Sequence, residues 1–294
     1  MFRNLTIAFV FMLLPQTAHA QEKYTIKLKE VAAGDTWRIE VKETGDSKTT
    51  NTIGKEKPKT EENKSSKHLL FTETIIEKPA DAKAPTKAKR VYEAAVIKGD
   101  GGVLGAKDRV PPYHGKTLLI EKKDKGYEFR IEGGEVLDKD IFELQSEFQG
   151  DGPNKPKAAF VPPGPVAVNE TWKFDPKLIF GDPGKDPNTQ VLNTEGTSKL
   201  VKVYKKDGRL YGVVETVVGL EMKMTPPNTT VTMKVTAKLN FDGCIDGTFA
   251  EGHMTGTLVM QTGSSATIPD IGTVSSSGQI NSAIDQTCKE LPKK

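Results

Sequence analysis

Two ten-residue stretches of the chain match each other position by position in chemistry. The first is 31–40, Val-Ala-Ala-Gly-Asp-Thr-Trp-Arg-Ile-Glu, and the second is 166–175, Val-Ala-Val-Asn-Glu-Thr-Trp-Lys-Phe-Asp. Each holds a Gly or Asn that tolerates positive φ, an acidic residue beside it, and one of the chain's two tryptophans, Trp37 or Trp172. Such a repeat predicts two related halves, each opening with a turn that leads into a strand.

After the first turn, apolar and charged side chains alternate. Trp37, Ile39 and Val41 fall on one face of an extended chain, and the residues between them are charged. This pattern predicts a half-buried strand whose indole anchors a core. A surface on which a ligand stacks against the tryptophan stays open as the alternative.

Period-two alternation recurs along the rest of the chain. It is clearest at 231–241, where Val, Met, Val, Ala, Leu and Phe alternate with Thr, Lys and Asn. The fold class predicted from this is mainly β, an antiparallel curved sheet or two half-barrels. We also expect 24–28 to be a first strand that forms a hairpin with the Trp37 strand.

Two segments depart from this alternation. Leu137, Ile141, Leu144 and Phe148 recur at helical spacing, which predicts one amphipathic helix near the middle of the chain, packed across the open face of a sheet. The stretch 44–67 contains hardly any apolar residue, so we expect it to be a mobile, solvated loop.

The N-terminus has the features of an export signal. Residues 1–20 combine a cation, a short apolar run and a final Ala-His-Ala, which predicts a signal peptide cleaved after Ala20. The remaining chain divides into an N-terminal β half, 21–150, and a C-terminal β half, 151–294, as two domains or one continuous β domain. We expect an exported protein, periplasmic or extracellular and soluble after cleavage, with no integral membrane segment.

Charge and cysteine content narrow the partners and the compartment. The formal net charge is only +3, from 42 basic and 39 acidic residues, which gives no reason to expect nucleic acid as a partner. Cys244 and Cys288 are the only cysteines, and in an exported chain they predict a disulfide. A metal site would need more ligands nearby, and a redox pair is more often Cys-x-x-Cys.

No set of residues indicates catalysis, a metal or a cofactor. His68, His114 and His253 are scattered, and no nucleophile motif of the Gly-x-Ser-x-Gly kind is present. We therefore expect a protein that is not an enzyme, with no catalytic residues, no metal and no cofactor. A hydrolase without a recognisable motif stays open as a third alternative.

Methionine is distributed unevenly. Outside the signal segment, every Met lies between Met222 and Met260. Met side chains fill irregular cores and are also frequent on surfaces that accept varied apolar ligands, so both interpretations stay open. The candidate ligand-binding residues are Met233, Met254 and Met260. Full burial of Met233 and Met260 beneath other side chains, with no adjoining cavity, would end that hypothesis.

The proline-rich lead 162–165, followed by the Thr-Trp motif that ends at Phe174, resembles a family of uncharacterised secreted bacterial β-rich proteins. The motif is echoed at 31–39, and Asn169 stands where the family usually has Gly. More distantly, the pattern resembles the half-barrel lipoprotein carriers of the periplasm. The resemblance implies a fold only, because the family has no assigned activity to carry over.

Three functions therefore remain, in order of preference. The first is an exported, non-catalytic binding module of the cell envelope, for an apolar ligand or lipid. The second is an envelope scaffold or protein-interaction domain, which an exposed sheet edge would favour. The third is the hydrolase, which clustered acids with shifted pKa values in a cleft would favour.

Overall fold

The computed structural model describes residues 22–82, 84–100, 107–124, 126–139, 141–148, 159–180, 186–227, 229–268 and 272–292. The predicted signal peptide 1–20, its cleavage site after Ala20 and the predicted boundary between 150 and 151 lie outside these residues. The elements in chain order are β1 (Lys23–Tyr24), β2 (Thr36–Ile53), β3 (Lys59–Glu77), β4 (Lys87–Asp100), β5 (Lys107–Arg109), β6 (Thr117–Lys123), β7 (Gly126–Ile131), α1 (Phe142–Glu147), β8 (Val166–Ala167), β9 (Thr171–Lys173), α2 (Lys177–Phe180), β10 (Thr189–Lys206), β11 (Arg209–Met224), β12 (Thr229–Cys244), β13 (Glu251–Ile268) and β14 (Gly272–Glu290).

Almost all strands belong to one antiparallel sheet of twelve strands. Their order is β7-β6-β4-β3-β2-β14-β13-β12-β11-β10-β9, with β5 paired to β4, and β1 and β8 form a separate two-stranded sheet. The mainly β, antiparallel fold class is thus confirmed. The end strands β7 and β9 do not pair with each other in the described part of the chain, so the sheet is open.

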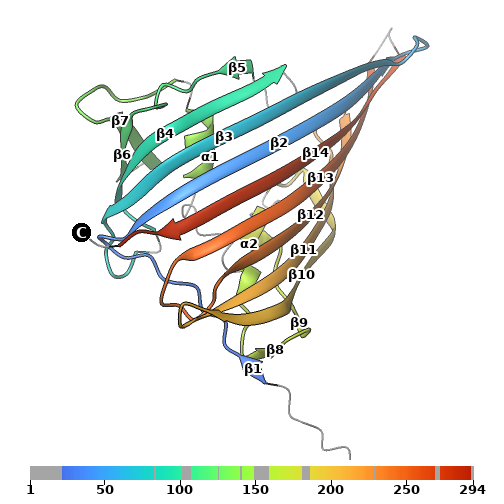
Figure 1. The fold of residues 1–294 in the computed structure, drawn as a ribbon. Helices are drawn as coiled ribbons and strands as arrows, with labels where there is room; N and C mark the ends of the chain where they lie inside the picture. The colour runs from blue at the N-terminus through green and yellow to red at the C-terminus, as the bar shows by residue number, and fades with distance from the viewer. Residues whose placement is uncertain are drawn as a thin grey trace, which may run out of the picture.

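The first and last long strands meet at the centre of this sheet. β2 pairs with β14 from Trp37↔Glu290 to Ile53↔Val274, so strands of both halves are joined by one continuous ladder. Figure 1 shows the sheet curving, with α1 and α2 lying on its concave side. We call the junction between β2 and β14 the seam.

The polar stretch 44–67 is not a loop, which corrects the expectation from its composition. β2 and β3 run on through it and pair from Thr44↔Ser66 to Asn51↔Lys59. Cross-strand contacts hold the polar ladder, such as the 2.8 Å ion pair between Lys48 and Glu62. The neighbouring strand β14 pairs with β2 along the same length, so the sheet supplies the backbone partners that composition alone could not reveal.

The N-terminal segment does not form a hairpin with β2. β1 pairs instead with β8, through Lys23↔Ala167 and Tyr24↔Val166, which ties the chain start to the second copy of the repeat. The physical reason is that β2 already has a strand on each side, β3 and β14.

The single amphipathic helix expected from Leu137 to Phe148 is not confirmed. α1 covers only Phe142–Glu147, and a second short helix, α2, follows β9. The backbone N–H of Leu137 bonds to the carbonyl of Phe129 at 2.8 Å, so this residue lies against β7 instead of starting a helix. The apolar residues nonetheless face the sheet, since Ile141, Leu144 and Phe148 are buried in the N-terminal core.

Each half contributes one hydrophobic core on the concave side. Trp37 lies in the first, and the residues around it include Phe71, Tyr92 and Leu118. Trp172 lies in the second, which includes Phe160, Leu200, Val214 and Ile245. Both tryptophans are 6% exposed. Burial of this much aromatic area is a large stabilising contribution in each half.

The two copies of the repeat adopt the same turn. Gly34 has φ 85° and Asn169 has φ 71°, the left-handed conformation that Gly adopts freely and Asn tolerates. In each copy the acidic side chain accepts a hydrogen bond from the backbone N–H three residues earlier, at 2.8 Å for Asp35 and 2.8 Å for Glu170. The sequence repeat is therefore also a repeat of local structure.

The expected disulfide is wrong. Cys244 and Cys288 are not joined. Cys288 pairs with Gly252 on β13, which pairs with Gly243 on β12, so the two cysteines lie two strands apart and Cys244 occupies the position next to Gly243, on the opposite face. Two strand spacings are about 10 Å, beyond the reach of a disulfide.

Candidate functional site

The candidate site is a patch of apolar side chains on the concave side of the sheet. Directly paired residues of antiparallel strands point to the same face, and alternate positions nearer the core pack inward, as Val214 and Phe241 do. The same alternation turns many apolar residues of β11 to β14 inward. We call nine of them the methionine face: Leu220, Met222, Met224, Val231, Met233, Val235, Leu258, Met260 and Ile280.

The structure brings together only two of the three predicted methionines. Met233 lies opposite Met222, and Met260 lies opposite Val235, one row nearer the core. Met254 is six residues from Met260 along β13, roughly 20 Å away, where it packs against the C-terminal core. Met254 is therefore part of the core cluster, and Met222 and Met224 take its place on the methionine face.

Charge is absent from this face. At the described positions 212–224, 229–243, 252–266 and 274–288, no inward residue of β11 to β14 is charged. The outward residues of the same strands are charged at many positions: Glu215, Glu221, Lys223, Lys234, Lys238, Asp242, Glu251, Asp285 and Lys289. The convex face is thus built for water and the concave face for apolar contact.

The methionines of this face are partly exposed. Met222, Met224, Met233 and Met260 are all of intermediate burial. Leu220 and Val235, by contrast, are buried, at 6% exposure each. The binding hypothesis required that Met233 and Met260 not be fully buried, and that condition is met. Flexible thioether chains at a partly exposed apolar face suit ligands of varied shape.

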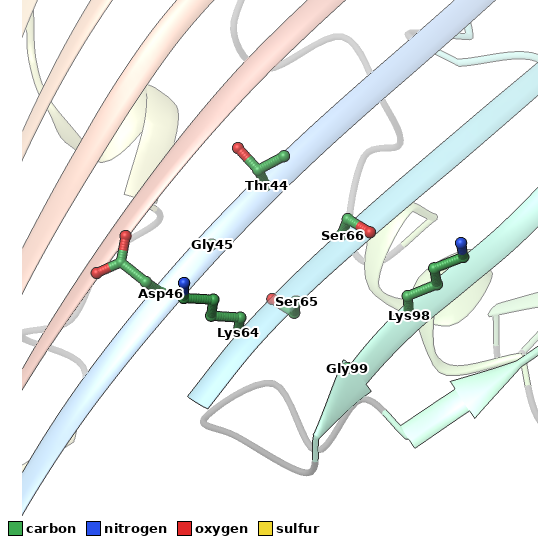
Figure 2. A pocket seen from close by; sticks show the side chains of 8 residues that line it. All are labelled: Thr44, Gly45, Asp46, Lys64, Ser65, Ser66, Lys98 and Gly99. Atoms are coloured by element: carbon green, nitrogen blue, oxygen red, sulfur yellow. The ribbon is translucent and has the colours of Figure 1, made fainter. Parts of the chain in front are cut away.

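A hollow on the other side of the sheet has opposite chemistry. A shallow hollow of about 410 Å³ lies over β2, β3 and β4. Figure 2 shows the residues that line it. Register places the side chains at its rim on the convex face, because Thr44 pairs with Ser66 and Ser66 with Lys98. Its lining is polar, so it does not extend the methionine face: Thr44, Gly45, Asp46, Lys64, Ser65, Ser66, Lys98 and Gly99.

Buried charge is concentrated in the N-terminal half. Arg90 is 1% exposed, donates to Glu73 at 2.5 Å, and makes a bidentate contact with Glu147 of α1 at 2.9 and 2.6 Å. Burial opposes the charge of Arg90, but the carboxylates of Glu147 and Glu73 outweigh it and raise the pKa of the guanidinium well above its ordinary value. This cluster joins α1 to the sheet, and both of its carboxylates bond to Arg90.

The histidines do not form a catalytic or metal-binding group. His68 lies 3.0 Å from Glu40, and His253 lies 3.0 Å from Asp285, each pair on the convex face. Among the residues that the structure describes, no three His, Cys, Asp or Glu side chains are placed to hold a metal ion. In the same residues, no helix is long and apolar enough to cross a membrane.

Comparison with known proteins gives only remote likenesses. No family model matches the chain, and no curated protein matches it. An outer-membrane channel from Pseudomonas putida F1 is 9% identical over 90% of this chain and 98% of that one, with a TM-score of 0.20. OpdQ of Pseudomonas aeruginosa is 8% identical over 88% and 98%, with a TM-score of 0.20. A loop-deletion form of OmpT from Vibrio cholerae is 8% identical over 87% and 99%, with a TM-score of 0.18. At these TM-scores the likenesses carry no argument about this chain.

Proposed function

We propose that the protein is an exported, non-catalytic binding module of the cell envelope that holds an apolar ligand against the methionine face. One observation carries this proposal. At positions 212–224, 229–243, 252–266 and 274–288 the inward faces of β11 to β14 are uncharged, and those of β11 to β13 carry partly exposed methionines, while the outward faces of the same strands are charged. The expected signal peptide at 1–20 supports the exported part of the proposal.

The energetics favour an apolar chain as the ligand. Each methylene group removed from water contributes about 0.8 kcal/mol. The inward residues Val231, Met233 and Met260 offer such a chain partly exposed apolar surface on three successive rows. A charged ligand would instead be desolvated there without a counter-charge, which is strongly unfavourable. An apolar or lipid-like molecule is therefore the ligand class that this surface suits.

Two adjacent residues on β13 provide a test of the proposal. Met260 points to the concave face, and its neighbour Val259, 36% exposed, points to the convex face. The mature protein purified from its own host should carry a small apolar adduct in native mass spectrometry. Met260→Glu should remove the adduct because it places a charge within the methionine face, and the matched control Val259→Glu should retain it.

Two outcomes would contradict the proposal. One is a protein without any adduct that also fails to bind apolar probes added to it. The other is an adduct lost equally from Met260→Glu and Val259→Glu, since the concave face would then have no special part in binding.

A second candidate function, a protein-interaction module, rests on the edge of the sheet. β10 is 18 residues long, yet among the described residues its outer edge pairs only with β9, at Thr197, Ser198 and Lys199. The stretch 189–195 thus leaves part of its backbone without a described strand partner, and such edges accept an added strand.

This second candidate is tested with a proline at the edge. The carbonyl of Gly196 and the N–H of Leu200 bond to the segment around β9, on the side of β10 away from β11. Backbone groups two residues apart along a strand point to the same side, so the N–H of Thr194 also points away from β11. Thr194→Pro should abolish co-purification of a specific protein partner while leaving the fold intact. Unchanged capture of that partner would exclude this edge as the interface.

A further inference from the structure

One buried hydroxyl on the concave side has no hydrogen-bond partner in the described part of the chain. Ser47 of β2 is 7% exposed, and its Oγ is among the buried polar atoms without a partner. Buried polar groups in folded proteins are nearly always paired, because an unpaired one is destabilising. An orphan of this kind requires an explanation, and pairing with a group outside the chain is one.

Ser47 stands at the end of an apolar row. Successive strand pairings place Leu220, Val235, Met260 and Ile280 side by side on β11, β12, β13 and β14, and Ile280 then pairs with Ser47. The four apolar residues span three strand spacings, roughly 14 Å. The row is therefore a narrow apolar track that crosses the methionine face and ends at a hydroxyl.

Neighbouring rows change polarity near the same place. One row away, Leu258 is followed by Ser282 on β14 and then by Gly45 and Ser65. On the other side, Met233 is followed by Thr262, and the row continues through Gly278 to Thr49. The concave surface is thus apolar on β11 and β12 and rich in hydroxyl groups near the seam.

The polar side of this boundary has charges, but they are paired. Glu43 and Lys67, which pair with each other two rows nearer the core than Ser47, form an ion pair at 2.5 Å. Lys59 and Glu61, further along the hairpin, form another at 3.3 Å. A charged head group beside Ser47 would therefore find no unpaired counter-charge on these inward positions, whereas a neutral group that accepts a hydrogen bond would be satisfied.

We propose that the ligand is an amphiphile with one long apolar chain and a neutral head group that accepts hydrogen bonds, such as an ester. Its chain lies along the row from Leu220 to Ile280, and its head accepts the hydroxyl of Ser47. The inference rests on the proposed function and adds the orientation of the ligand and the class of its head group. Because Leu220, Val235 and Ser47 are buried, binding includes a shift of the side chains that cover them.

The experiment compares three ligands with the same twelve-carbon chain length. Monolaurin has a neutral ester head, dodecanoate has an anionic head, and dodecane has none; each competes with the apolar fluorescent probe N-phenyl-1-naphthylamine on the mature protein. We expect monolaurin to displace the probe at the lowest concentration. Ser47→Ala should weaken monolaurin about five-fold, which corresponds to one hydrogen bond, and leave dodecane unchanged.

A matched control and a second readout separate binding from folding. Ser66→Ala makes the same chemical change on the convex face of β3, where Ser66 pairs with Thr44, and should alter neither ligand. The melting temperature of Ser47→Ala without ligand should equal or exceed that of the wild type, because the substitution removes an unpaired buried hydroxyl. A purely structural serine would instead lower it.

The possible failures are distinguishable. If dodecane displaces the probe as well as monolaurin does, or if Ser47→Ala weakens neither, the head-group inference is overturned while the binding module stands. If dodecanoate binds most tightly, the neutral head group is overturned. If the probe and all three ligands fail to bind, the proposed function is overturned together with this inference.

Discussion

The two copies of the repeat lead into equivalent rows of the sheet with different buried chemistry. In the N-terminal half, Trp37 pairs with Glu73, which pairs with Arg90. In the C-terminal half, Trp172 pairs with Ser198, and Ser198 with Thr216. The N-terminal row thus contains a buried ion pair between Glu73 and Arg90. The C-terminal row contains two buried hydroxyl groups 2.7 Å apart.

This difference shows how one turn serves two purposes. In the charged row, Arg90 forms an ion pair with Glu147 of α1. We call this link between the N-terminal part of the sheet and α1 the clamp. The hydroxyl row needs no counter-charge; it is completed by a bond from Ser198 to the carbonyl of Ala159 at 2.9 Å. The C-terminal concave side can therefore stay uncharged, which is the property on which the methionine face depends.

The largest expected effect breaks the charged row. Arg90→Met leaves Glu73 and Glu147 without their buried partner, so the free energy of unfolding should fall by about 3–5 kcal/mol in urea denaturation. Arg38→Met is the matched control, because Arg38 forms an exposed pair with Glu93 and should lose less than about 1 kcal/mol. Equal losses in the two variants would contradict the clamp.

The next effect uses pH and belongs to the neighbouring row of the N-terminal half, in which Tyr92 pairs with Phe71. Burial raises the pKa of Tyr92 to about 12, against about 10 in an unfolded chain. The folded state therefore favours the protonated phenol, so this stability is fully present below pH 10 and is lost as the pH rises toward 12. The free energy of unfolding lost in this way amounts to about 2–3 kcal/mol. Urea midpoints between pH 9 and 12 should fall more steeply for the wild type than for Tyr92→Phe; identical slopes would exclude Tyr92 as a source.

A smaller effect tests the hydroxyl row. Ser198→Ala removes the partner of Thr216 and of the Ala159 carbonyl, so the free energy of unfolding should fall by about 1–2 kcal/mol. Thr216→Val should lower the free energy of unfolding less in the Ser198→Ala background than in the wild type, because the two hydroxyl groups bond to each other. Strict additivity in a double-mutant cycle would show that the pair is not coupled.

The smallest effects test whether the two turns are equivalent. Gly34→Ala forces an L-residue to φ 85° with no other atom within 4 Å of the added carbon, so the loss of about 1–2 kcal/mol comes from backbone strain alone. Asn169→Gly relieves the milder strain of the second copy and should stabilise the protein by about 0.5 kcal/mol. Thermal denaturation measures both, with Gly164→Ala as a neutral control. A Gly34→Ala variant that is not destabilised, or an Asn169→Gly variant that is, would contradict equivalence.

Local sequence patterns predicted the parts of the fold in which one strand face is apolar. The alternation at 231–241 became β12, and the repeated motif became two matching turns. The hairpin of β2 and β3 was missed because residues 44–67 are polar on both faces, so no alternation marks them as strands. Its support comes from β14, where Asn281 pairs with Asp46 across 235 residues of the chain.

The candidate site was predictable in composition but not in arrangement. The clustering of methionines between Met222 and Met260 was visible in the sequence, yet only register shows that Met254 belongs to the core and that Met222 faces Met233. Ser47 could not be found at all, because a serine in a polar stretch has no signal of burial. For Arg90 the sequence held only a weak signal of burial: the arginine stands two residues before Tyr92, so in a strand both lie on the same face.

The central claim is that an apolar chain lies on the methionine face, and photo-cross-linking tests it most directly. A monoacylglycerol with a diazirine on its acyl chain is bound to the purified protein and irradiated, and the adducts are mapped by tandem mass spectrometry. We predict adducts at inward residues of β11 to β14, with Met233 and Met260 among them. Adducts at convex positions such as Val259, or spread evenly over the surface, would contradict the account.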